Sequence, residues 1–549
     1  MKNTLMIILA AILLLVSAIG SLSAAEALPD IGDLYKKKDV EANWDEDEVT
    51  AVDLTALSAD TFTIDRAGTY LLSGSYTGRL IVDAKDEKVH IILNGANISS
   101  KSGPAIHEVS ADKLIVTLAG DSLNTLACGE VLQVGEETIG AALYAEDDLS
   151  INGSGSLTIS ASAKHGIQCK KDLILANGQY DIRCEGDAVR GRNSVLILDG
   201  SFTIRCGGDG IASTRSDKDG KGWVIIAGGT FDIITGEGAG KVRVSTPFGS
   251  SWGTSRSASE EAPSQKAVKA EKGLTVTGGR FVIDCADDAL HSNAGITIAG
   301  GTFQIKCADD AVHADGDLAI SSGVIRVPQC FEGLEGANIF IDGGEISLVC
   351  SDDGINASGI STESANNRFR GVDETDNGAQ LVINGGDITV DAGGDAIDSN
   401  GSFTINGGLL RCRAATMGGE GSIDFNGTGT VYGGTVLAVG TGGVMKDTAQ
   451  LGGCPLLSVS VGSRNAGTVI SVKDADGNEL ISYAPDAQFN SILFVSAAIG
   501  QGDTCTVMCG DEAVYSGKYE SNVSSYGGFP GQGPGRPGGG WGNPGGRGR

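Results

Sequence analysis

A repeat of 22 residues runs through the middle of this chain and constrains its fold more than any single residue does. The copies share a glycine pair, an aromatic residue, a cysteine, an acidic pair and a histidine, at Gly278-Gly279 and Gly300-Gly301, Phe281 and Phe303, Cys285 and Cys307, Asp287-Asp288 and Asp309-Asp310, and His291 and His313. A unit this short holds about three brief strands and cannot bury a core by itself, so successive units must stack. The repeat therefore predicts a solenoid.

An acidic residue followed by a small and an aliphatic residue marks each repeat, and we call it the marker acid. Its copies are Asp187, Asp209, Asp288, Asp310, Glu332, Asp353 and Asp395, with His165 and Lys266 in the corresponding places of two further copies. Intervals longer than one repeat predict loops that leave the solenoid, near 213–221, 236–265 and 357–380. With weaker copies around Ala105 and Ala141, we expect about a dozen coils.

Apolar and polar residues alternate within each repeat, as in Phe303-Gln-Ile305-Lys-Cys307. This period of two predicts strands rather than helices. Each glycine pair precedes a strand, where a tight turn with positive φ has no Cβ penalty. Because parallel crossovers within one sheet are almost always right-handed, we predict an all-β, right-handed parallel β-helix.

Both ends of the chain depart from the repeat. Residues 1–25 carry an early lysine, an apolar run and small residues at Ser23 and Ala25, which is typical of a cleaved secretory signal. We interpret 26–49 as a linker and 50–443 as the β-helix. Alternating runs around an Asp476-Gly-Asn478 turn predict a small antiparallel β cap over 444–521. The Gly/Pro-rich residues 522–549 are predicted to be a disordered tail.

The signal sequence predicts a protein that is secreted or held at the cell surface. A second apolar span of about 18 residues is missing from the sequence, so we expect no transmembrane span. We also expect a monomer.

The chain has 12 cysteines, which in an exported protein ordinarily indicate disulfides. Five of them share one position three residues before the marker acid and should point into the coil: Cys184, Cys206, Cys285, Cys307 and Cys350. Coils about 4.8 Å apart leave parallel Cβ atoms farther apart than the usual disulfide limit of about 4.5 Å. We therefore expect buried free thiols, with disulfides as the alternative.

Stacking places the marker acids in a column, where unit charges about 4.8 Å apart repel by roughly 1 kcal/mol in water. Three arrangements relieve that repulsion: hydrogen bonds from backbone N–H groups, calcium between coils, or raised carboxyl pKa values. For calcium, the candidate ligands are Asp287, Asp288, Asp309, Asp310, Glu332, Asp352 and Asp353.

A second column lies three residues beyond the marker acids, and we expect it to face solvent. Such a strip of regularly spaced polar side chains could follow a linear polysaccharide; an ordinary solvated sheet face is the alternative. Two histidines without a third ligand predict a zinc site only weakly. Trp252 in a predicted loop offers an aromatic platform for a sugar, whereas Trp223 fits either that role or a loop anchor. The candidate carbohydrate-binding residues are Arg190, Trp252, Lys269, His291, His313, Glu335, Asn356 and Asp398.

The net charge of −29 at pH 7 excludes a nucleic-acid-binding surface over the body of the protein. It also opposes simple attraction of acidic polymers. If acidic sugars bind, bound calcium must reverse the local charge.

The ordered series of marker phrases resembles a bacterial carbohydrate-binding domain family of exported parallel β-helix proteins. The phrases are Asp288-Ala-Leu-His291, Asp310-Ala-Val-His313, Phe331-Glu332-Gly-Leu-Glu335, Ser351-Asp-Asp353-Gly-Ile-Asn356 and Asp395-Ala-Ile-Asp398, within a resemblance from about Gly68 to Gly517. The resemblance implies binding to cellulose and to acidic polysaccharides such as polygalacturonate, calcium in the fold, and coils similar to those of pectate lyases. This sequence departs at Ala289 and Ala311, where the family more often has glycine.

We therefore predict an exported, non-catalytic polysaccharide-binding protein that uses calcium. Lys266, Lys269, Lys306 and Arg326 could supply the base that a lyase needs, but none lies in a lyase motif, so we assign no catalytic residue. The alternatives are a calcium-dependent, pectate-type polysaccharide lyase, and a cell-surface adhesin or structural spacer.

Overall fold

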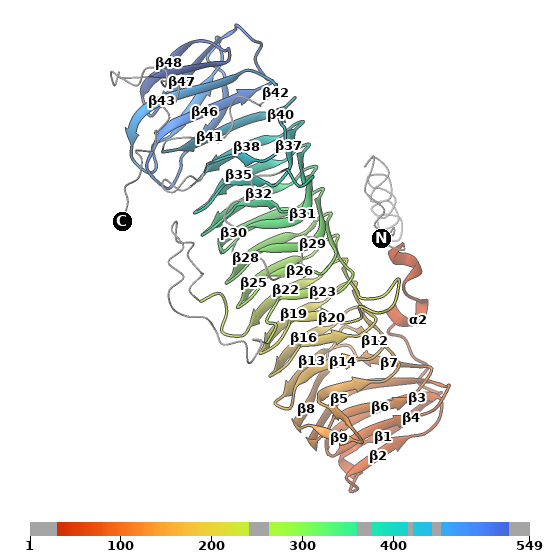
Figure 1. The fold of residues 1–549 in the computed structure, drawn as a ribbon. Coiled ribbons are helices and arrows are strands. Elements are labelled where there is room, and N and C mark those ends of the chain that lie inside the picture. The colour runs from red at the N-terminus through yellow and green to blue at the C-terminus, as the bar shows by residue number, and fades with distance from the viewer. Residues whose placement is uncertain (1–29, 241–262, 360–375, 415–420, 442–451, 526–549) are drawn as a thin grey trace, which may run out of the picture.

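The computed structural model describes residues 30–240, 263–359, 376–414, 421–441 and 452–525. Their strands wind into an elongated stack of coils in which equivalent strands pair in parallel (Figure 1). This is the all-β, solenoid-like architecture that the repeat predicts. The handedness of the winding and the number of coils stay predictions, and the expected signal peptide and tail lie outside the described residues.

A regular coil contains three strands, for example β26 (Leu290–Ser292), β27 (Gly295–Ile298) and β28 (Thr302–Cys307). Strands in the same place of successive coils pair with each other, so the stack has three faces, which we call A, B and C. On face A, His291 is paired with His313, and on face C, Cys285 is paired with Cys307. Residues 22 apart are therefore immediate neighbours across coils, as the repeat requires.

The strands divide among these faces as follows. Face A contains β6 (Ile106–Ser110), β11 (Ala141–Ala145), β14 (His165–Cys169), β17 (Val189–Gly191), β20 (Ile211–Ser213), β23 (Val268–Ala270), β26, the first parts of β29 (Val312–Ile320) and β31 (Leu334–Ile341), β33 (Ile355–Ala357), β36 (Ile397–Ser399) and β39 (Asp424–Phe425). Face B contains β7 (Lys113–Leu118), β12 (Asp148–Gly153), β15 (Asp172–Leu175), β18 (Ser194–Ile197), β21 (Trp223–Ile226), β24 (Gly273–Val276), β27, the second parts of β29 and β31, β34 (Gln380–Ile383), β37 (Ser402–Ile405), β40 (Gly429–Val431) and β42 (Gly452–Gly453). Face C contains β8 (Leu123–Glu130), β13 (Ser156–Ala161), β16 (Gln179–Cys184), β19 (Ser201–Cys206), β22 (Thr230–Thr235), β25 (Arg280–Cys285), β28, β30 (Val324–Cys330), β32 (Glu345–Cys350), β35 (Asp387–Asp391), β38 (Leu409–Arg413) and β41 (Thr435–Gly440).

The interior is a set of stacked side chains of one kind. Rings of Tyr180, Phe202, Phe231, Phe281 and Phe303 lie parallel, with centroids 4.6 to 5.0 Å apart in successive coils. The glycine before each of the last three strands has positive φ, for example +103° at Gly301, as the paired glycines predict. The apolar side of each strand thus stacks on the coils above and below it, because one coil has no second layer of its own.

The N-terminal coils are built from longer strands: β1 (Val49–Asp53), β2 (Thr61–Ile64), β3 (Gly68–Thr77), β4 (Arg79–Asp83) and β5 (Lys88–Ser102). Before them, η2 (Ile31–Asp33) and α2 (Lys37–Val40) lie against face B. Asp39 is buried there, with an ion pair to Lys113 and a hydrogen bond from Ser150. The segment interpreted as a linker is therefore docked onto the solenoid over this stretch.

The C-terminal strands form a separate hydrophobic cluster. They are β43 (Leu456–Arg464), β44 (Ile470–Lys473), β45 (Glu479–Tyr483), β46 (Phe489–Ser496), β47 (Thr504–Cys509), β48 (Glu512–Lys518) and β49 (Asn522–Ser525). A hairpin joins β44 to β45, and β46 pairs antiparallel with β41, the last strand of face C. This unit therefore covers one end of the stack (Figure 1).

A short hairpin of β9 (Leu132–Val134) and β10 (Glu137–Ile139) and the turn η3 (Leu54–Ala56) complete the described elements.

Candidate functional site

The marker acids lie in the turns between face C and face A, and each one hydrogen-bonds to the next coil. Asp288 Oδ1 accepts the backbone N–H of Asp310 at 3.1 Å, and Asp310 Oδ1 accepts that of Glu332 at 3.3 Å. The same bond recurs from Asp187 to the next marker position at 3.0 Å and from Asp353 at 2.7 Å. The acidic column is thus a ladder that joins successive turns, which is the backbone hydrogen-bonding alternative for these carboxylates.

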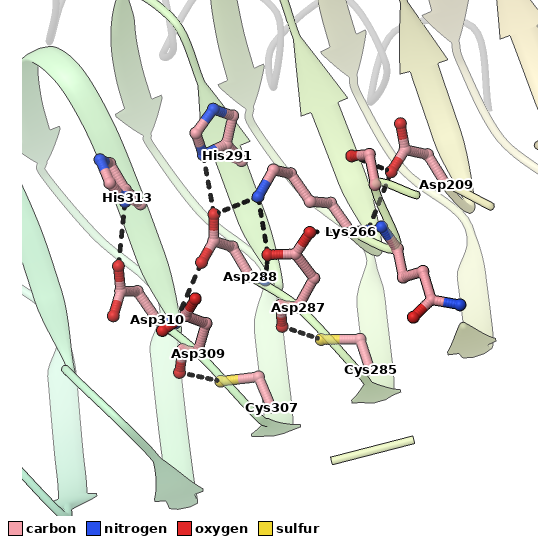
Figure 2. Close-up of polar contacts among 12 residues, drawn as sticks. Asp209, Lys266, Cys285, Asp287, Asp288, His291, Cys307, Asp309, Asp310 and His313 are labelled. Atoms are coloured by element: carbon pink, nitrogen blue, oxygen red, sulfur yellow. Dashed lines mark hydrogen bonds and ion pairs between the residues drawn. The ribbon is translucent and has the colours of Figure 1, made fainter. Parts of the chain in front are cut away.

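The second carboxylate oxygen binds the side chain three residues later. His291 Nδ1 lies 2.9 Å from Asp288 Oδ2, and His313 Nδ1 lies 2.9 Å from Asp310 Oδ2 (Figure 2). Glu332 differs, because its Oε2 accepts from the amide of Asn356, 24 residues later and in the next coil, at 3.1 Å. The two predicted columns therefore form one connected network. His291 and His313 fold back onto the marker acids of their own turns, whereas Asn356 reaches the marker acid of the preceding coil.

This arrangement corrects the expectation that the second column faces solvent. His291 is buried, with 8% of its surface exposed, and the other described members are half-buried: Arg190, Lys269, His313, Glu335, Asn356 and Asp398. Their alignment is as predicted, since Glu335 pairs with His313 and Asn356 pairs with Glu335.

The sequence suggests Trp252 and Trp223 as candidate aromatic platforms for a sugar, and the structure describes one of them. Trp252 lies outside the described residues. Trp223 is buried on face B, where it packs with Ile174 and Leu196, and its indole N–H donates to the Gly220 carbonyl at 3.1 Å. Trp223 is therefore a loop anchor, not a sugar platform.

Lys266 stands in the column where the other copies have an acid. Its Nζ lies 2.8 Å from Asp287 Oδ1 and 2.6 Å from Asp288 Oδ2 (Figure 2). Burial by itself would raise the pKa of Asp288, but the hydrogen bond from His291 and the charge of Lys266 hold it well below its usual range. Burial acts to lower the pKa of Lys266, yet the two carboxylates raise it above the usual value. The first Asp doublet thus has a protein cation in place.

Two coils further along, the carboxylates are not compensated in this way. Burial, followed by the charges of Asp310, Glu335 and Asp353, raises the pKa of Glu332 to about 9. Burial also raises the pKa of Glu335 to about 7, against the opposing charge of His313. Here His313 is the local cation: burial lowers its pKa, but the bond to Asp310 and the charge of Glu335 outweigh that effect and raise it to about 9.

The inward cysteines also hold these turns. Cys285 Sγ donates to the Asp287 carbonyl at 3.1 Å, and Cys307 Sγ donates to the Asp309 carbonyl at 3.3 Å (Figure 2). All 12 cysteines are free thiols in the structure. The repeated cysteines are thus more than the small apolar residues that the sequence predicts, and their fixed distance from the marker acid is the signal for this shared turn contact.

Sequence reasoning missed one acidic cluster at the end of the ladder. Asp395, Asp398 and Asp424 place one oxygen each within 4.8 Å of one another. The sequence does not indicate Asp424, because the repeat is irregular there. Its pairing with Asp398 on face A shows that Asp424 continues the column that contains Asp398.

Part of this chain is similar to a known protein family. Residues 58–311 match the family model described as "Carbohydrate-binding domain-containing protein". This segment, a little under half of the chain, is thus similar to a carbohydrate-binding family. The resemblance that we extended to Gly517 stays a prediction beyond residue 311.

Two individual proteins are also similar. A carbohydrate-binding domain-containing protein from Acetivibrio thermocellus is 30% identical over 147 residues, which are 26% of this chain and 51% of that protein. The chain thus spans about half the length of this curated relative. A solved structure of a polysaccharide lyase-like protein from C. thermocellum, a gadolinium derivative, is 23% identical, with a TM-score of 0.37 over 50% of this chain and 96% of that chain. Within the described residues, no helix combines the length and apolar character that a membrane crossing needs.

Proposed function

We propose that this protein is an exported, non-catalytic polysaccharide-binding β-helix whose ligands are cellulose or acidic cell-wall polysaccharides. The observation that carries the proposal is the match of residues 58–311 to a carbohydrate-binding family. Right-handed winding of about a dozen coils is part of the proposal. Polar side chains in register at about 4.8 Å per coil give a linear polymer a repeating set of hydrogen-bonding partners.

The environment of Lys266 supports a non-catalytic role. A lyase of this fold would need a base to take a proton from the sugar ring, and a general base must be deprotonated near the working pH. Lys266 is enclosed by two carboxylates that raise its pKa, so it stays protonated. Arg326 is engaged by Glu345 in an ion pair.

Calcium fits one part of the ladder better than the other. The Asp287–Asp288 doublet does not fit, because the Lys266 ammonium already lies between its carboxylates. The stretch containing Asp310, Glu332 and Asp353 has His313 only at its Asp310 end, and the Asn356 Oδ1 atom beside Glu332 is buried without a hydrogen-bond partner. Calcium takes about six to eight oxygen ligands, so these residues and the adjoining Asp309 and Asp352 are the ones that would hold it. Bound there, calcium would supply positive charge to an acidic sugar.

Binding to insoluble polysaccharides tests the proposal directly. We expect the purified chain to co-sediment with cellulose or pectate, and pectate binding to fall when EDTA removes calcium. Bovine serum albumin and an uncharged bead matrix serve as controls. A chain that remains in the supernatant with every polysaccharide would overturn the proposal and favour a structural spacer.

Ultraviolet absorbance separates binding from lyase activity. Incubation with polygalacturonate and calcium should leave absorbance unchanged, because no unsaturated uronate forms. A steady rise that Lys266→Met abolishes would instead establish a lyase.

A further inference from the structure

A groove crosses the outer edge of face C in the N-terminal half of the molecule. Two adjoining hollows of about 670 Å³ and 310 Å³ share Ser160 and Ser162 as lining residues. Both lie where the strands of face C end and the turns to face A begin. Ligand sites in proteins occupy roughly 300–1,000 Å³, so the combined hollow has the volume of a binding site.

The groove follows one outward column of face C across five coils. Ser99 pairs with Ala127, Ala127 with Ser160, Ser160 with Arg183, and Arg183 with Arg205. The hollow exists because the first three side chains are short, while the two arginines form its far end. The column therefore changes from small side chains to arginines along the solenoid axis, and Glu130 and Glu185 also line the two hollows.

Stacked turns fix the wall of the groove. The Ser162 hydroxyl donates to the Gly129 carbonyl at 3.1 Å, and the Ser162 backbone N–H donates to Cys128 at 3.1 Å. Gly129 permits this stacking, because a Cβ there would lie 2.9 Å from the Lys101 carbonyl oxygen. A wall tied by such bonds loses little conformational entropy when a ligand enters.

We propose that this groove is the main polysaccharide-binding site, and that it takes a hydroxyl-rich sugar chain with an acidic group at the Arg183–Arg205 end. The inference rests on the proposed function and gives that function a location. It moves the site from the half-buried polar column of face A to the open edge of face C.

The chemistry of the lining sets the ligand class. Guanidinium groups bind carboxylates through paired N–H donors, and serine hydroxyls exchange hydrogen bonds with sugar hydroxyls. Arg205 is held by Asp232 at 2.9 Å, whereas Arg183 is 65% exposed and lies 3.4 Å from Asp181. Among the described residues that line the groove none is aromatic, so the stacking platform that favours neutral glucans is missing there.

The position of the groove agrees with the family match. All lining residues, from Ser99 to Arg205, lie within the matched segment 58–311. Of the face A column, Glu335, Asn356 and Asp398 lie beyond that segment. The part of the chain assigned to a carbohydrate-binding family thus contains the whole groove but only part of the alternative strip.

Blocking the groove floor tests its role. Ser160 is exposed on β13, so Ser160→Trp fills the hollow without disturbing the core. The matched control is Gln304→Trp, an exposed position on the same face five coils away. With the full-length protein, we expect Ser160→Trp to weaken pectate binding about tenfold or more, a change of about 1.4 kcal/mol per decade, and Gln304→Trp to leave it unchanged. Thermal unfolding of both variants checks that each is folded.

Removing the exposed guanidinium tests the acidic end. Arg183→Gln should lower affinity for polygalacturonate several-fold and leave affinity for the methyl-esterified polymer unchanged, while Arg280→Gln, an exposed arginine outside the groove, should change neither. Equal losses on both polymers would contradict a carboxylate contact at Arg183.

The outcomes separate this inference from the proposed function. If the wild type binds pectate and Ser160→Trp binds it equally well, the groove is not the site although the function stands. If Lys269→Ala weakens binding and Ser160→Trp does not, the site lies on face A. If the wild type binds no polysaccharide, the proposed function itself fails.

Discussion

The turns at Asp288 and Glu332 lie two coils apart in the acidic ladder. Each holds a largely buried carboxyl group, but different neighbours surround it. At Asp288, the buried carboxylate is paired with Lys266 and His291 and stays ionised. At Glu332, the partner in the described structure is a neutral amide, Asn356, and the pKa is raised to about 9. The backbone fold is the same at both places, so the difference arises from the side chains that stacking brings together.

This difference shows that a repeated acid need not have a repeated role. The Lys266 turn is electrostatically complete and stabilises the solenoid. At the Glu332 turn, burial and the neighbouring carboxylates disfavour the ionised form of Glu332, and binding of a proton or a divalent cation would remove that cost. The following changes test that contrast, from the largest expected effect to the smallest.

Lys266→Met should destabilise the protein by about 3–5 kcal/mol, because it leaves the buried Asp288 and the half-buried Asp287 without their cation. Denaturant unfolding measures this effect. Lys306→Met, at an exposed lysine on face C, is the matched control and should change stability by less than about 0.5 kcal/mol. Equal effects of the two variants would refute the assignment of Lys266 as the buried counter-ion.

Stability in EDTA should decline as pH rises toward 9. The folded pKa values of Glu332, about 9, and Glu335, about 7, lie above the ordinary 4.5, and that of His313, about 9, lies above 6.5. Raised pKa values stabilise the fold below the unfolded values, and this contribution is lost as pH passes through the folded values. The loss should be on the order of 3 kcal/mol.

Calcium should flatten this decline if it occupies the Glu332 stretch. Unfolding midpoints measured between pH 5 and 9, with EDTA and with calcium, test both points. A stability that rises with pH in EDTA would contradict the raised pKa values.

Replacing the carboxylate by an amide should change the free energy of unfolding in opposite directions at the two turns. Asp288→Asn should destabilise by about 2 kcal/mol, since it removes the charge that Lys266 and His291 bind. Glu332→Gln should stabilise the calcium-free protein at pH 8 by on the order of 2 kcal/mol, because Glu332, ionised in the unfolded chain, must bind a proton on folding and glutamine need not. Unfolding of both variants in EDTA gives the comparison, and matching signs would break it.

Arg190→Gln should have the smallest effect, about 0–1 kcal/mol. Arg190 pairs with the marker acid Asp187 at 2.5 Å, as Lys266 pairs with Asp288, but one third of its side chain is exposed and water can replace it. A double-mutant cycle with Asp187→Asn measures the coupling. A coupling as large as that of Lys266 with Asp288 would show that burial does not explain the contrast.

The core of the fold could be predicted from the repeat because its features are local and periodic. Phe281 and Phe303, or Cys285 and Cys307, recur at a fixed interval, and stacking strands can only place them on top of each other. The antiparallel strands of the C-terminal unit also followed from alternation and the Asp476-Gly-Asn478 turn. The docking of Asp39 against Lys113 and Ser150 could not be predicted, because no period links positions so far apart.

The candidate site was predictable in its alignment but not in its exposure. Sequence spacing put His291 and His313 in one column, yet it could not show that both rings turn back onto Asp288 and Asp310. The groove was missed entirely. It depends on the sizes of Ser99, Ala127 and Ser160, which stand at irregular intervals and become neighbours only through strand register.

The sequence by itself determined that equivalent residues form columns, since a 22-residue unit must stack to bury its apolar side chains. Only the tertiary structure decided which charges are paired, which are left to a proton or an ion, and where the surface is hollow. Those properties depend on side-chain direction and on neighbours from other coils, and the repeat fixes only the backbone on which they are arranged.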